Sequence, residues 1–276
     1  MIVFLNGKFV AEKKATVSVF DRGFLYGDGL FEGVLIKDGL PFRWDQHMER
    51  LGEGIRFLKL TMPYRAEKLH RFALELVKRN RIPDCILRLS LSRGITARGY
   101  SPKNAVHPAV VMTLHPLPVA GGKGIPRWHV IVASLRLPVN DPLTRFKTAN
   151  KLTQVLARAE ADVAGAQEAI LLNTAGYVGE GTTSNVFWLE GGAVFTTPLP
   201  SGALPGVTRA TIFDVCVKMN IPCREKKIKP AGLFRAHGAF LTMTSMGVVE
   251  IGFLDGRRLR RSPLVSKLAA AYKEML

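Results

Sequence analysis

The chain has 276 residues, 47% of them hydrophobic and 22% charged, so it can bury one large core or two of ordinary size. It contains no apolar stretch long enough to span a bilayer, and its start lacks the basic region and cleavage site of a signal peptide. We therefore expect a cytoplasmic protein with no membrane partner. Cys85, Cys216 and Cys223 lie in apolar segments without CxxC spacing, which predicts buried thiols and neither a disulfide frame nor a metal site.

The formal net charge of +17 is the unusual bulk property of the chain. Nucleic-acid binding would gather basic residues on one element, interleaved with aromatic residues. The densest basic runs, 224–229 and 257–261, adjoin strand or turn patterns and contain no aromatic residue. We therefore expect a solvated surface that attracts anionic substrates, and no nucleic-acid partner.

The first part of the chain mixes both periodicities. Residues 2–10 predict two strands around an Asn6-Gly7 turn. Alternating apolar residues predict further strands, and helical spacing predicts amphipathic helices; the strands are 86–92 and 109–114, and the helices are 45–58 and 66–78. These elements predict an N-terminal α/β domain over residues 1–117, followed by an interdomain linker at 118–126, which is rich in Pro and Gly.

The remainder, residues 127–276, repeats this mixture and predicts a second domain. The expected strands are 128–135, 169–172, 185–189 and 193–197, and the expected helices are 150–163 and 208–219. Two α/β (α+β) domains are the simplest architecture, and clefts between domains are where cofactors usually bind.

Three segments of the second domain supply what pyridoxal 5′-phosphate requires. A carbonyl cofactor needs an amine for a Schiff base, an acid beside its pyridine nitrogen and donors for its phosphate. Lys147 precedes a predicted helix, Glu180 lies in the polar run 178–185, and residues 203–209 lead into another helix. Backbone N–H groups of Val207 and Thr208 at that helix start are natural phosphate donors.

The same segments, together with residues 21–33 and 47–51, resemble motifs of the fold-type IV family of pyridoxal-phosphate enzymes, both in their residues and in their order along the chain. This class IV aminotransferase family includes branched-chain and D-amino-acid aminotransferases and 4-amino-4-deoxychorismate lyase. The resemblance runs from about residue 4 to about residue 251. It implies a smaller N-terminal α/β domain, a larger C-terminal pseudo-barrel domain that binds the cofactor, and a homodimer.

The resemblance also implies roles for single residues. Lys147 is the expected Schiff-base lysine, with Lys151 as its rival, and Glu180 is expected to pair with the pyridine nitrogen. The expected ring and phosphate contacts are Leu204 on the ring face, and Arg50, Val207, Thr208, Thr244 and Ser245 at the phosphate. Taken singly, each residue has an ordinary alternative: a surface lysine, a turn carboxylate after a glycine, or an arginine on the surface of a helix.

Substrate recognition is suggested by two residues. Arg98, in a loop that resembles the lyase pattern, is a candidate clamp for a substrate carboxylate, with a solvent-exposed loop arginine as the alternative. Phe31 occupies the place of a tyrosine in D-amino-acid aminotransferases, and Gly33 stands where the lyase usually has threonine. We expect a ping-pong aminotransferase that uses an amino donor and a 2-keto acid; the alternative is a lyase that releases pyruvate and 4-aminobenzoate.

Overall fold

The computed structural model describes residues 1–118 and 124–276 and divides the chain into two compact units. The first unit comprises Met1–Leu117 and Phe146–Lys151, and the second comprises Pro118–Arg145 and Leu152–Leu276. Residues 119–123 of the expected linker lie outside the described residues. The short segment Phe146–Lys151 clusters with the first unit, although the sequence interpretation assigned it to the C-terminal domain.

An antiparallel sheet of six strands, in the order β2-β1-β6-β5-β3-β4, forms the centre of the first unit. Its strands are β1 (Ile2–Leu5), β2 (Lys8–Ala11), β3 (Gly29–Lys37), β4 (Leu40–Pro41), β5 (Cys85–Ser92) and β6 (Val110–Pro116). The predicted turn joins β1 to β2, and both of its residues, Asn6 and Gly7, have positive φ angles, of 46° and 88°.

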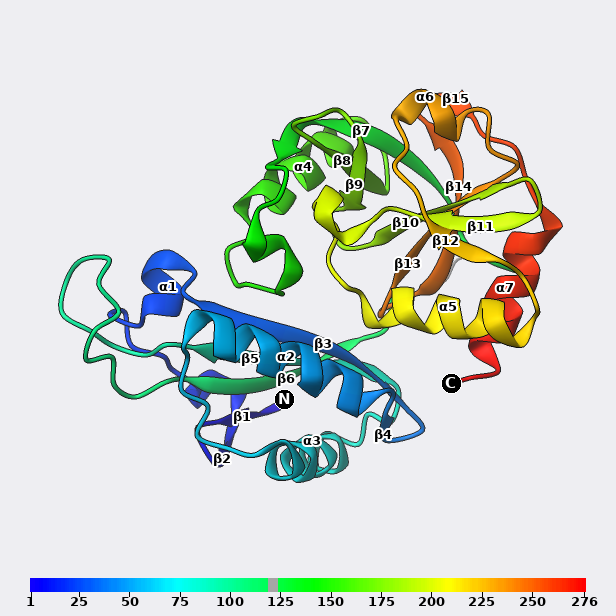
Figure 1. Cartoon of the computed structure of the whole chain (residues 1–276). Coiled ribbons are helices and arrows are strands. Elements are labelled where there is room, and N and C mark those ends of the chain that lie inside the picture. The colour runs from blue at the N-terminus through cyan, green and yellow to red at the C-terminus, as the bar shows by residue number, and fades with distance from the viewer. Residues whose placement is uncertain (119–123) are drawn as a thin grey trace. The chain divides into compact units, whose positions relative to one another are not determined.

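One face of this sheet carries the hydrophobic core of the first unit. The helices are α1 (Arg22–Tyr26), α2 (Trp44–Leu58) and α3 (Ala66–Asn80), after a 3-10 turn η1 (Glu12–Lys14). Apolar residues of α2 and α3 pack with those of the strands into one core, and Figure 1 shows both helices against the sheet. Because side chains alternate along a strand, Leu30 and Glu32 of β3 lie on this covered face, while Phe31 lies on the other.

The second unit is built on a mixed sheet of nine strands. Its strands are β7 (Arg127–Leu137), β8 (Glu168–Asn173), β9 (Val178–Gly181), β10 (Asn185–Glu190), β11 (Ala193–Thr196), β12 (Cys223–Glu225), β13 (Ala239–Met243), β14 (Gly247–Leu254) and β15 (Arg257–Arg258). The main path runs β12-β11-β10-β13-β14-β7-β8-β9, and β15 pairs with β14. The sheet is curled, since its end strand β9 contacts β10 (Figure 1).

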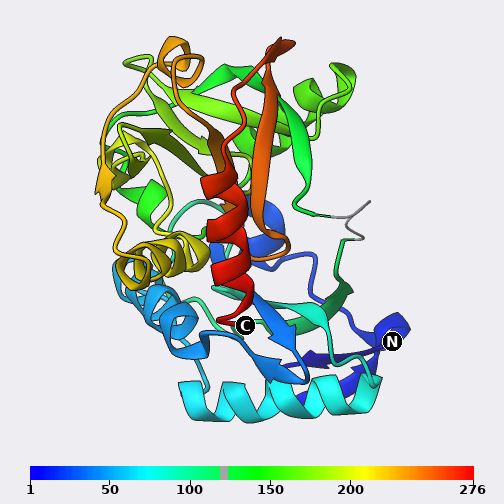
Figure 2. The ribbon, with the colours of Figure 1, turned by 90° about the vertical axis from the view of Figure 1, so that its right-hand side faces the viewer.

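Helices cover this curled sheet at two places. They are α4 (Leu152–Val163), α5 (Val207–Lys218), α6 (Pro230–Leu233) and α7 (Pro263–Lys273), with 3-10 turns η2 (Pro142–Arg145) and η3 (Leu199–Ser201). Helix α4 packs on β7 and β8, whereas α5 packs on α7 and β13; Figures 1 and 2 show α5 and α7 side by side. None of the helices in the described ranges is long and apolar enough to cross a membrane.

The mixed α/β class expected from the sequence is confirmed, and the predicted strands and helices form within a few residues of the expected bounds. The analysis of periodicity missed β3, β9, β13, β14 and α7, together with the short elements β4, β12, β15, α1 and α6. Strands β13 and β14 are buried along almost their whole length, so they lack the alternation by which half-buried strands are found.

Candidate active site

Lys147 lies on a short extended segment that is hydrogen-bonded to the start of β3. The carbonyl of Lys147 accepts from the N–H of Phe31 at 2.9 Å, and the N–H of Ala149 donates to the carbonyl of Gly29 at 2.9 Å. The Nζ atom of Lys147 lies 4.7 Å from the centre of the Phe31 ring. Two long-range backbone bonds therefore fix this lysine beside Phe31. Lys151, its rival, directly precedes α4.

Arg88 of β5 contacts the same aromatic ring. Its guanidinium carbon lies 3.8 Å from the centre of the Phe31 ring, and desolvation lowers the pKa of Arg88. Sequence reasoning did not select this residue. The available signal was the alternation of the strand 86–92, in which the leucines share one face and Arg88 lies on the other.

Arg50 is buried in a charged network and does not lie on the helix surface. Its Nε donates to Glu32 Oε1 at 2.8 Å and a terminal nitrogen contacts Glu32 Oε2 at 2.5 Å. The ring nitrogen Nδ1 of His47, one turn earlier on α2, lies 2.8 Å from Glu32 Oε2. All three side chains are at most 8% exposed. The alternative of a surface arginine is therefore wrong.

The protonation of this network follows from its burial and charges. Burial raises the pKa of Glu32, but the charge of Arg50 and the hydrogen bonds from His47 and Arg50 outweigh this and lower it to about 2. Burial lowers the pKa of His47; Glu32 raises it, and the charges of Arg50 and Lys147 lower it further, so the net shift is downward. The network is an ionised Glu32 between a cation and a largely neutral imidazole. Glu32 was not selected from the sequence, although a charge between Leu30 and Val34 on the apolar face was a signal.

Arg98 lies in the exposed loop that follows β5. The structure groups Phe31, Arg50 and Lys147 around the start of β3, and leaves Arg98 on a separate loop of the same unit.

In the second unit, Glu180 lies in strand β9 and not in a turn. Its Oε2 accepts a hydrogen bond from the N–H of Leu204 at 2.8 Å. The carbonyl of Leu204 in turn accepts from Nδ2 of Asn185 at 2.9 Å and from the N–H of Gly206 at 2.8 Å. Both polar groups of the Leu204 main chain are thereby fixed, which joins Glu180 to the segment that leads into α5.

A buried carboxylate that sequence reasoning missed holds the strand of Glu180 in place. Glu168, which is 1% exposed, accepts from the N–H of Thr182 at 3.1 Å and from the Ser184 hydroxyl at 3.0 Å. The hydroxyls of Thr182 and Thr183 donate to the same carboxylate. The polar residues after Glu180 therefore supply the hydrogen bonds that the buried Glu168 carboxylate needs. The sequence signal for Glu168 was an acidic residue directly before an apolar strand.

The N-terminus of α5 has the features of a phosphate site. Its N-cap residue, Gly206, makes no side-chain capping bond, and its first turn holds no acid, so backbone N–H groups at Val207 and Thr208 lack a side-chain cap. A Cβ on Gly206 would stand 2.1 Å from Oδ1 of Asn185, so a larger residue here would have to displace the Asn185 side chain.

Thr244 and Ser245, the other expected phosphate contacts, lie in the turn between β13 and β14, and α5 packs against β13. Just before this turn, Thr242 pairs with Asn185 across the sheet. Its buried hydroxyl oxygen has no partner among the described residues. The donor set of an uncapped helix start with neighbouring hydroxyl groups fits a phosphate monoester. Among the described residues, no cluster of His, Cys, Asp and Glu could hold a metal ion.

A family model described as amino-transferase class IV matches residues 29–252 of the chain. The chain therefore belongs to the class IV aminotransferase family and is an enzyme of that family.

Two curated relatives illustrate the range of the family. A protein of Methanocaldococcus jannaschii named "Putative branched-chain-amino-acid aminotransferase" is 34% identical, over 100% of this chain and 96% of its own length. The aminodeoxychorismate lyase of Bacillus subtilis is 30% identical, over 90% of this chain and 85% of its own.

Solved structures share the fold over nearly the whole chain. The crystal structure of the branched-chain aminotransferase of Thermoproteus uzoniensis with norvaline has a TM-score of 0.90 at 30% identity, and covers 99% of this chain and 94% of that chain. Another branched-chain amino acid aminotransferase, solved with pyridoxamine 5′-phosphate, has a TM-score of 0.91 at 27% identity, and covers 99% of this chain and 93% of that chain.

Proposed function

We propose that this chain is a pyridoxal-phosphate-dependent aminotransferase that moves an amino group between a branched-chain amino acid and a 2-keto acid by a ping-pong mechanism. The observation that carries the proposal is the fixed position of Lys147, whose segment pairs with β3 so that its Nζ lies 4.7 Å from the Phe31 ring. A lysine that acts as a Schiff-base nucleophile must be held in a fixed position, next to an apolar side chain that restricts the access of water. With the cofactor bound, Lys147 would move a proton between the substrate Cα and the C4′ atom of the cofactor.

Glu180 is the acid of the proposed site. Bound pyridoxal phosphate would supply an aldehyde that condenses with amines and a ring that withdraws electrons from the substrate carbon. A carboxylate beside the ring nitrogen favours its protonated form. Glu180 fits this role because the Leu204 N–H bond at 2.8 Å fixes one carboxylate oxygen and so orients the other.

For the phosphate, we assign Val207 and Thr208 at the start of α5, together with Thr244 and Ser245. The absence of a side-chain cap at Gly206 supports this assignment. The family resemblance also implies a phosphate role for Arg50, whose guanidinium binds Glu32 through two nitrogens. We therefore assign Arg50 a share in the electrostatics of the phosphate rather than a bidentate bond to it.

The preference for a branched apolar donor is supported by Phe31, an aromatic side chain next to Lys147. Arg88, stacked on the same ring, would bind the second carboxylate of an acidic keto acid such as 2-oxoglutarate, because a guanidinium suits a carboxylate. Arg98 would bind the carboxylate on the reacting carbon. A ping-pong aminotransferase binds its two substrates in turn at one site, so this site would have to accept both the apolar amino donor and the acidic keto acid.

We also propose a homodimer. Large apolar side chains around α1 are unusually exposed: Phe24 is 74% exposed, Phe20 66%, Val19 63% and Leu25 47%. Neighbouring exposed apolar residues of this kind mark interaction surfaces. Sedimentation equilibrium tests the proposal: we expect twice the mass of the chain, with dissociation on Phe24→Asp. A monomeric wild-type protein would refute it.

The first experiment on function is the absorbance spectrum of the protein loaded with pyridoxal phosphate, before and after addition of single L- and D-amino acids without a keto acid. We expect L-valine, L-leucine or L-isoleucine to shift the cofactor band to that of pyridoxamine phosphate. A shift only with D-alanine would correct the substrate class, and no cofactor band at all would refute the proposal.

The lyase reaction is the second candidate, favoured by the Bacillus subtilis relative. The sequence departs from the lyase at Gly33, where a Cβ would meet no atom closer than 3.9 Å, so a larger residue fits there. Formation of 4-aminobenzoate from aminodeoxychorismate, with no amino acid converting the cofactor, would favour the lyase. Gly33→Thr is the matched variant, since it introduces the lyase residue at a position with room for an added Cβ.

A further inference from the structure

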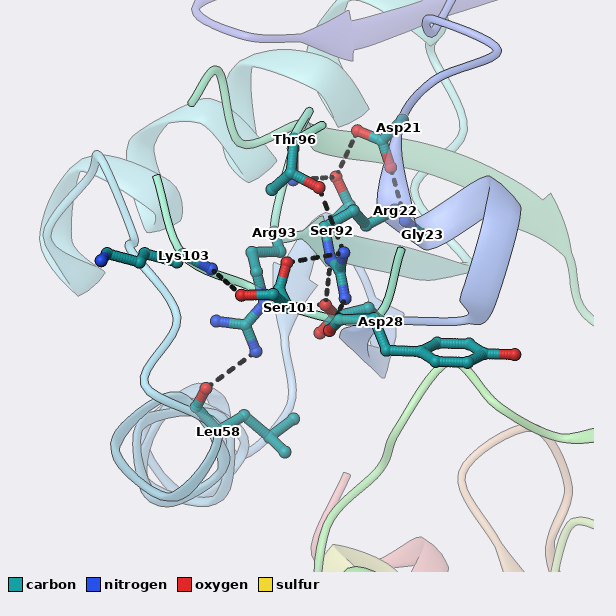
Figure 3. Close-up of polar contacts among 12 residues, drawn as sticks. Asp21, Arg22, Gly23, Asp28, Leu58, Ser92, Arg93, Thr96, Ser101 and Lys103 are labelled. Atoms are coloured by element: carbon teal, nitrogen blue, oxygen red, sulfur yellow. Dashed lines mark hydrogen bonds and ion pairs between the residues drawn. The ribbon is translucent and has the colours of Figure 1, made fainter. Parts of the chain in front are cut away.

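Three charged residues outside the proposed chemistry join the start of β3 to the loop that carries Arg98. Asp28 Oδ2 accepts from Nε of Arg22 at 2.7 Å and from Nε of Arg93 at 2.7 Å. Figure 3 shows both arginines next to Asp28. We call these three residues the Arg22 clamp.

The guanidinium of Arg22 holds the turn of the loop that follows Arg98. It donates to three consecutive backbone carbonyls, those of Gly99 at 2.9 Å, Tyr100 at 2.9 Å and Ser101 at 3.2 Å. It also donates to the Thr96 hydroxyl at 3.1 Å. The Arg22 side chain is only 5% exposed, so one cation is buried within the bend of an otherwise exposed loop.

Arg93 ties the other side of the clamp to the end of α2. Its terminal nitrogens donate to the carbonyls of Leu58 at 2.9 Å and Lys59 at 3.1 Å. Leu58 is the last residue of α2, the helix that carries Arg50, and Lys59 is its C-cap; carbonyls at the end of a helix have no partner within it. Burial raises the pKa of Asp28, but Arg93 and Arg22 outweigh it and lower the pKa, so the central carboxylate stays ionised at neutral pH.

The loop has one further requirement at its turn. Gly99, which directly follows Arg98, has a φ of 113°, a conformation that residues with a side chain rarely adopt. The base of the loop is held separately by backbone bonds between Ile95 and Val106 at 2.8 and 2.9 Å. Arg22 and Gly99 thus determine the turn itself, and the turn determines the backbone from which Arg98 projects.

We propose that Arg22 is a positioning residue for substrate binding: through the clamp and the Gly99 turn it holds Arg98 where it binds the substrate carboxylate. This inference rests on the role of Arg98 in the proposed function. Lysine at position 22 keeps the charge, but its compact ammonium cannot bind Asp28 and three carbonyls at once.

The test is a double-mutant cycle of Arg22→Lys and Arg98→Ala in the cofactor-loaded enzyme. We expect Arg22→Lys to raise KM for the amino donor about 10-fold and to change kcat less than about 2-fold, because binding and not chemistry is affected. In the Arg98→Ala background the same change should alter KM less than about 2-fold, since the two residues act through one contact. Effects that multiply independently, or an unchanged KM in the single variant, would overturn the proposal. Arg79→Lys, in an exposed pair with Glu75, is the control.

A second readout does not depend on activity. Trypsin cleaves after arginine, and in the cofactor-free protein Arg22→Lys should speed cleavage at the Arg98–Gly99 bond about 5-fold or more, because a released turn opens locally more often. Equal cleavage rates would overturn the proposal. If the wild-type protein converts no amino acid, the proposed function fails, while this assay still decides whether the clamp holds the turn.

Gly99→Ala covers the case in which Arg22→Lys does not fold. An added Cβ at Gly99 meets no atom within 4 Å, so the substitution acts only through the backbone angle. We expect the same rise in KM, which is the readout for this variant because residue 99 forms part of the bond that trypsin cleaves. Gly39→Ala is the matched control, because Gly39 also has a positive φ, of 81°, with no atom within 4 Å, in the hairpin between β3 and β4. Equal behaviour of the two variants would contradict the proposal.

Discussion

The two units hold their candidate residues by different means. In the first unit, main-chain bonds hold Lys147, but the other candidate residues depend on buried charge pairs: Glu32 binds Arg50 and His47, and Asp28 binds Arg22 and Arg93. In the second unit, side chains hold the main chain. Glu180 and Asn185 bind the two polar groups of Leu204, and Gly206 leaves the start of α5 without a side-chain cap.

This difference predicts which substitutions matter in each unit. Where charges are buried in pairs, removal of one partner leaves the other without compensation, so stability suffers first. Where main-chain groups form the site, the shape of the backbone matters, and a single added methyl group is enough to disturb it. The predictions below test this distinction.

Lys147→Ala has the largest expected effect. We expect kcat to fall by about 10³-fold or more, because the residue is both nucleophile and proton carrier in the proposed reaction. The bound cofactor should also lose its Schiff-base absorbance. Lys151→Ala is the matched control, four residues further along the same segment, and should retain that absorbance. If the two variants exchanged these results, the Schiff base would belong to Lys151.

Glu32→Gln should reduce the stability of the first unit strongly. Loss of the charge leaves Arg50 buried without its counter-ion, which costs about 3–5 kcal/mol in the free energy of unfolding. Urea unfolding measures this, and Glu75→Gln, in an exposed pair, should change it by less than about 0.5 kcal/mol. Similar values for both variants would mean that the buried network contributes little.

The same network predicts how stability depends on pH. The pKa of Glu32 is lowered from 4.5 to about 2 in the folded chain, so its contribution is complete above pH 4.5 and is lost as the pH falls towards 2. The wild-type protein should therefore lose stability across this window more steeply than Glu32→Gln. Parallel curves of unfolding free energy against pH would contradict the assignment.

Elements that depend on neighbouring residues could be predicted from the sequence, whereas contacts between residues far apart in the chain could not. The Asn6-Gly7 hairpin and the amphipathic pattern of α2 and α3 depend on neighbouring residues, and both were predicted. The burial of Arg50 was not, because its partner Glu32 comes from β3, which periodicity missed. The membership of Lys147 in the first unit depends on pairing with Gly29 and Phe31, far away in sequence.

The candidate site was predicted in parts for the same reason. Residue types and their local order suggested Lys147, Glu180 and the start of α5. Contacts made by residues from separate strands, such as Arg88 on Phe31 and Glu168 with Thr182, require the register of the sheets. Register is a property of the folded chain, so neither contact had a decisive local signal.

Glu180→Gln separates charge from hydrogen bonding in the second unit. Glutamine keeps an oxygen that accepts from the Leu204 N–H, so we expect little change in unfolding temperature. Loss of the carboxylate charge should lower kcat about 10²-fold, because the ring nitrogen would no longer be held protonated. Unfolding temperature and kcat measured on one preparation decide this. Unchanged kcat would remove Glu180 from the site, and a large fall in stability would make it a structural residue.

Gly206→Ala has the smallest expected effect and tests the role of the backbone most directly. The φ of Gly206 is −67°, which alanine adopts without strain, so the only obstacle is Oδ1 of Asn185, 2.1 Å from the new Cβ. Asn185 is 5% exposed and bound to Leu204, so it cannot move away without breaking that bond. Such overpacking costs about 1–3 kcal/mol and should displace the first turn of α5.

Weaker cofactor binding, about 10-fold by absorbance titration, is therefore expected for Gly206→Ala, since about 1.4 kcal/mol corresponds to that factor. Gly52→Ala, in the middle of α2, is the control: its nearest neighbour would be a terminal nitrogen of Arg56 at 3.5 Å, and alanine favours helices. It should leave cofactor binding unchanged. If Gly206→Ala lost stability but kept its affinity for the cofactor, the tight contact with Asn185 would serve the fold, and the phosphate would have to be held elsewhere than at the start of α5.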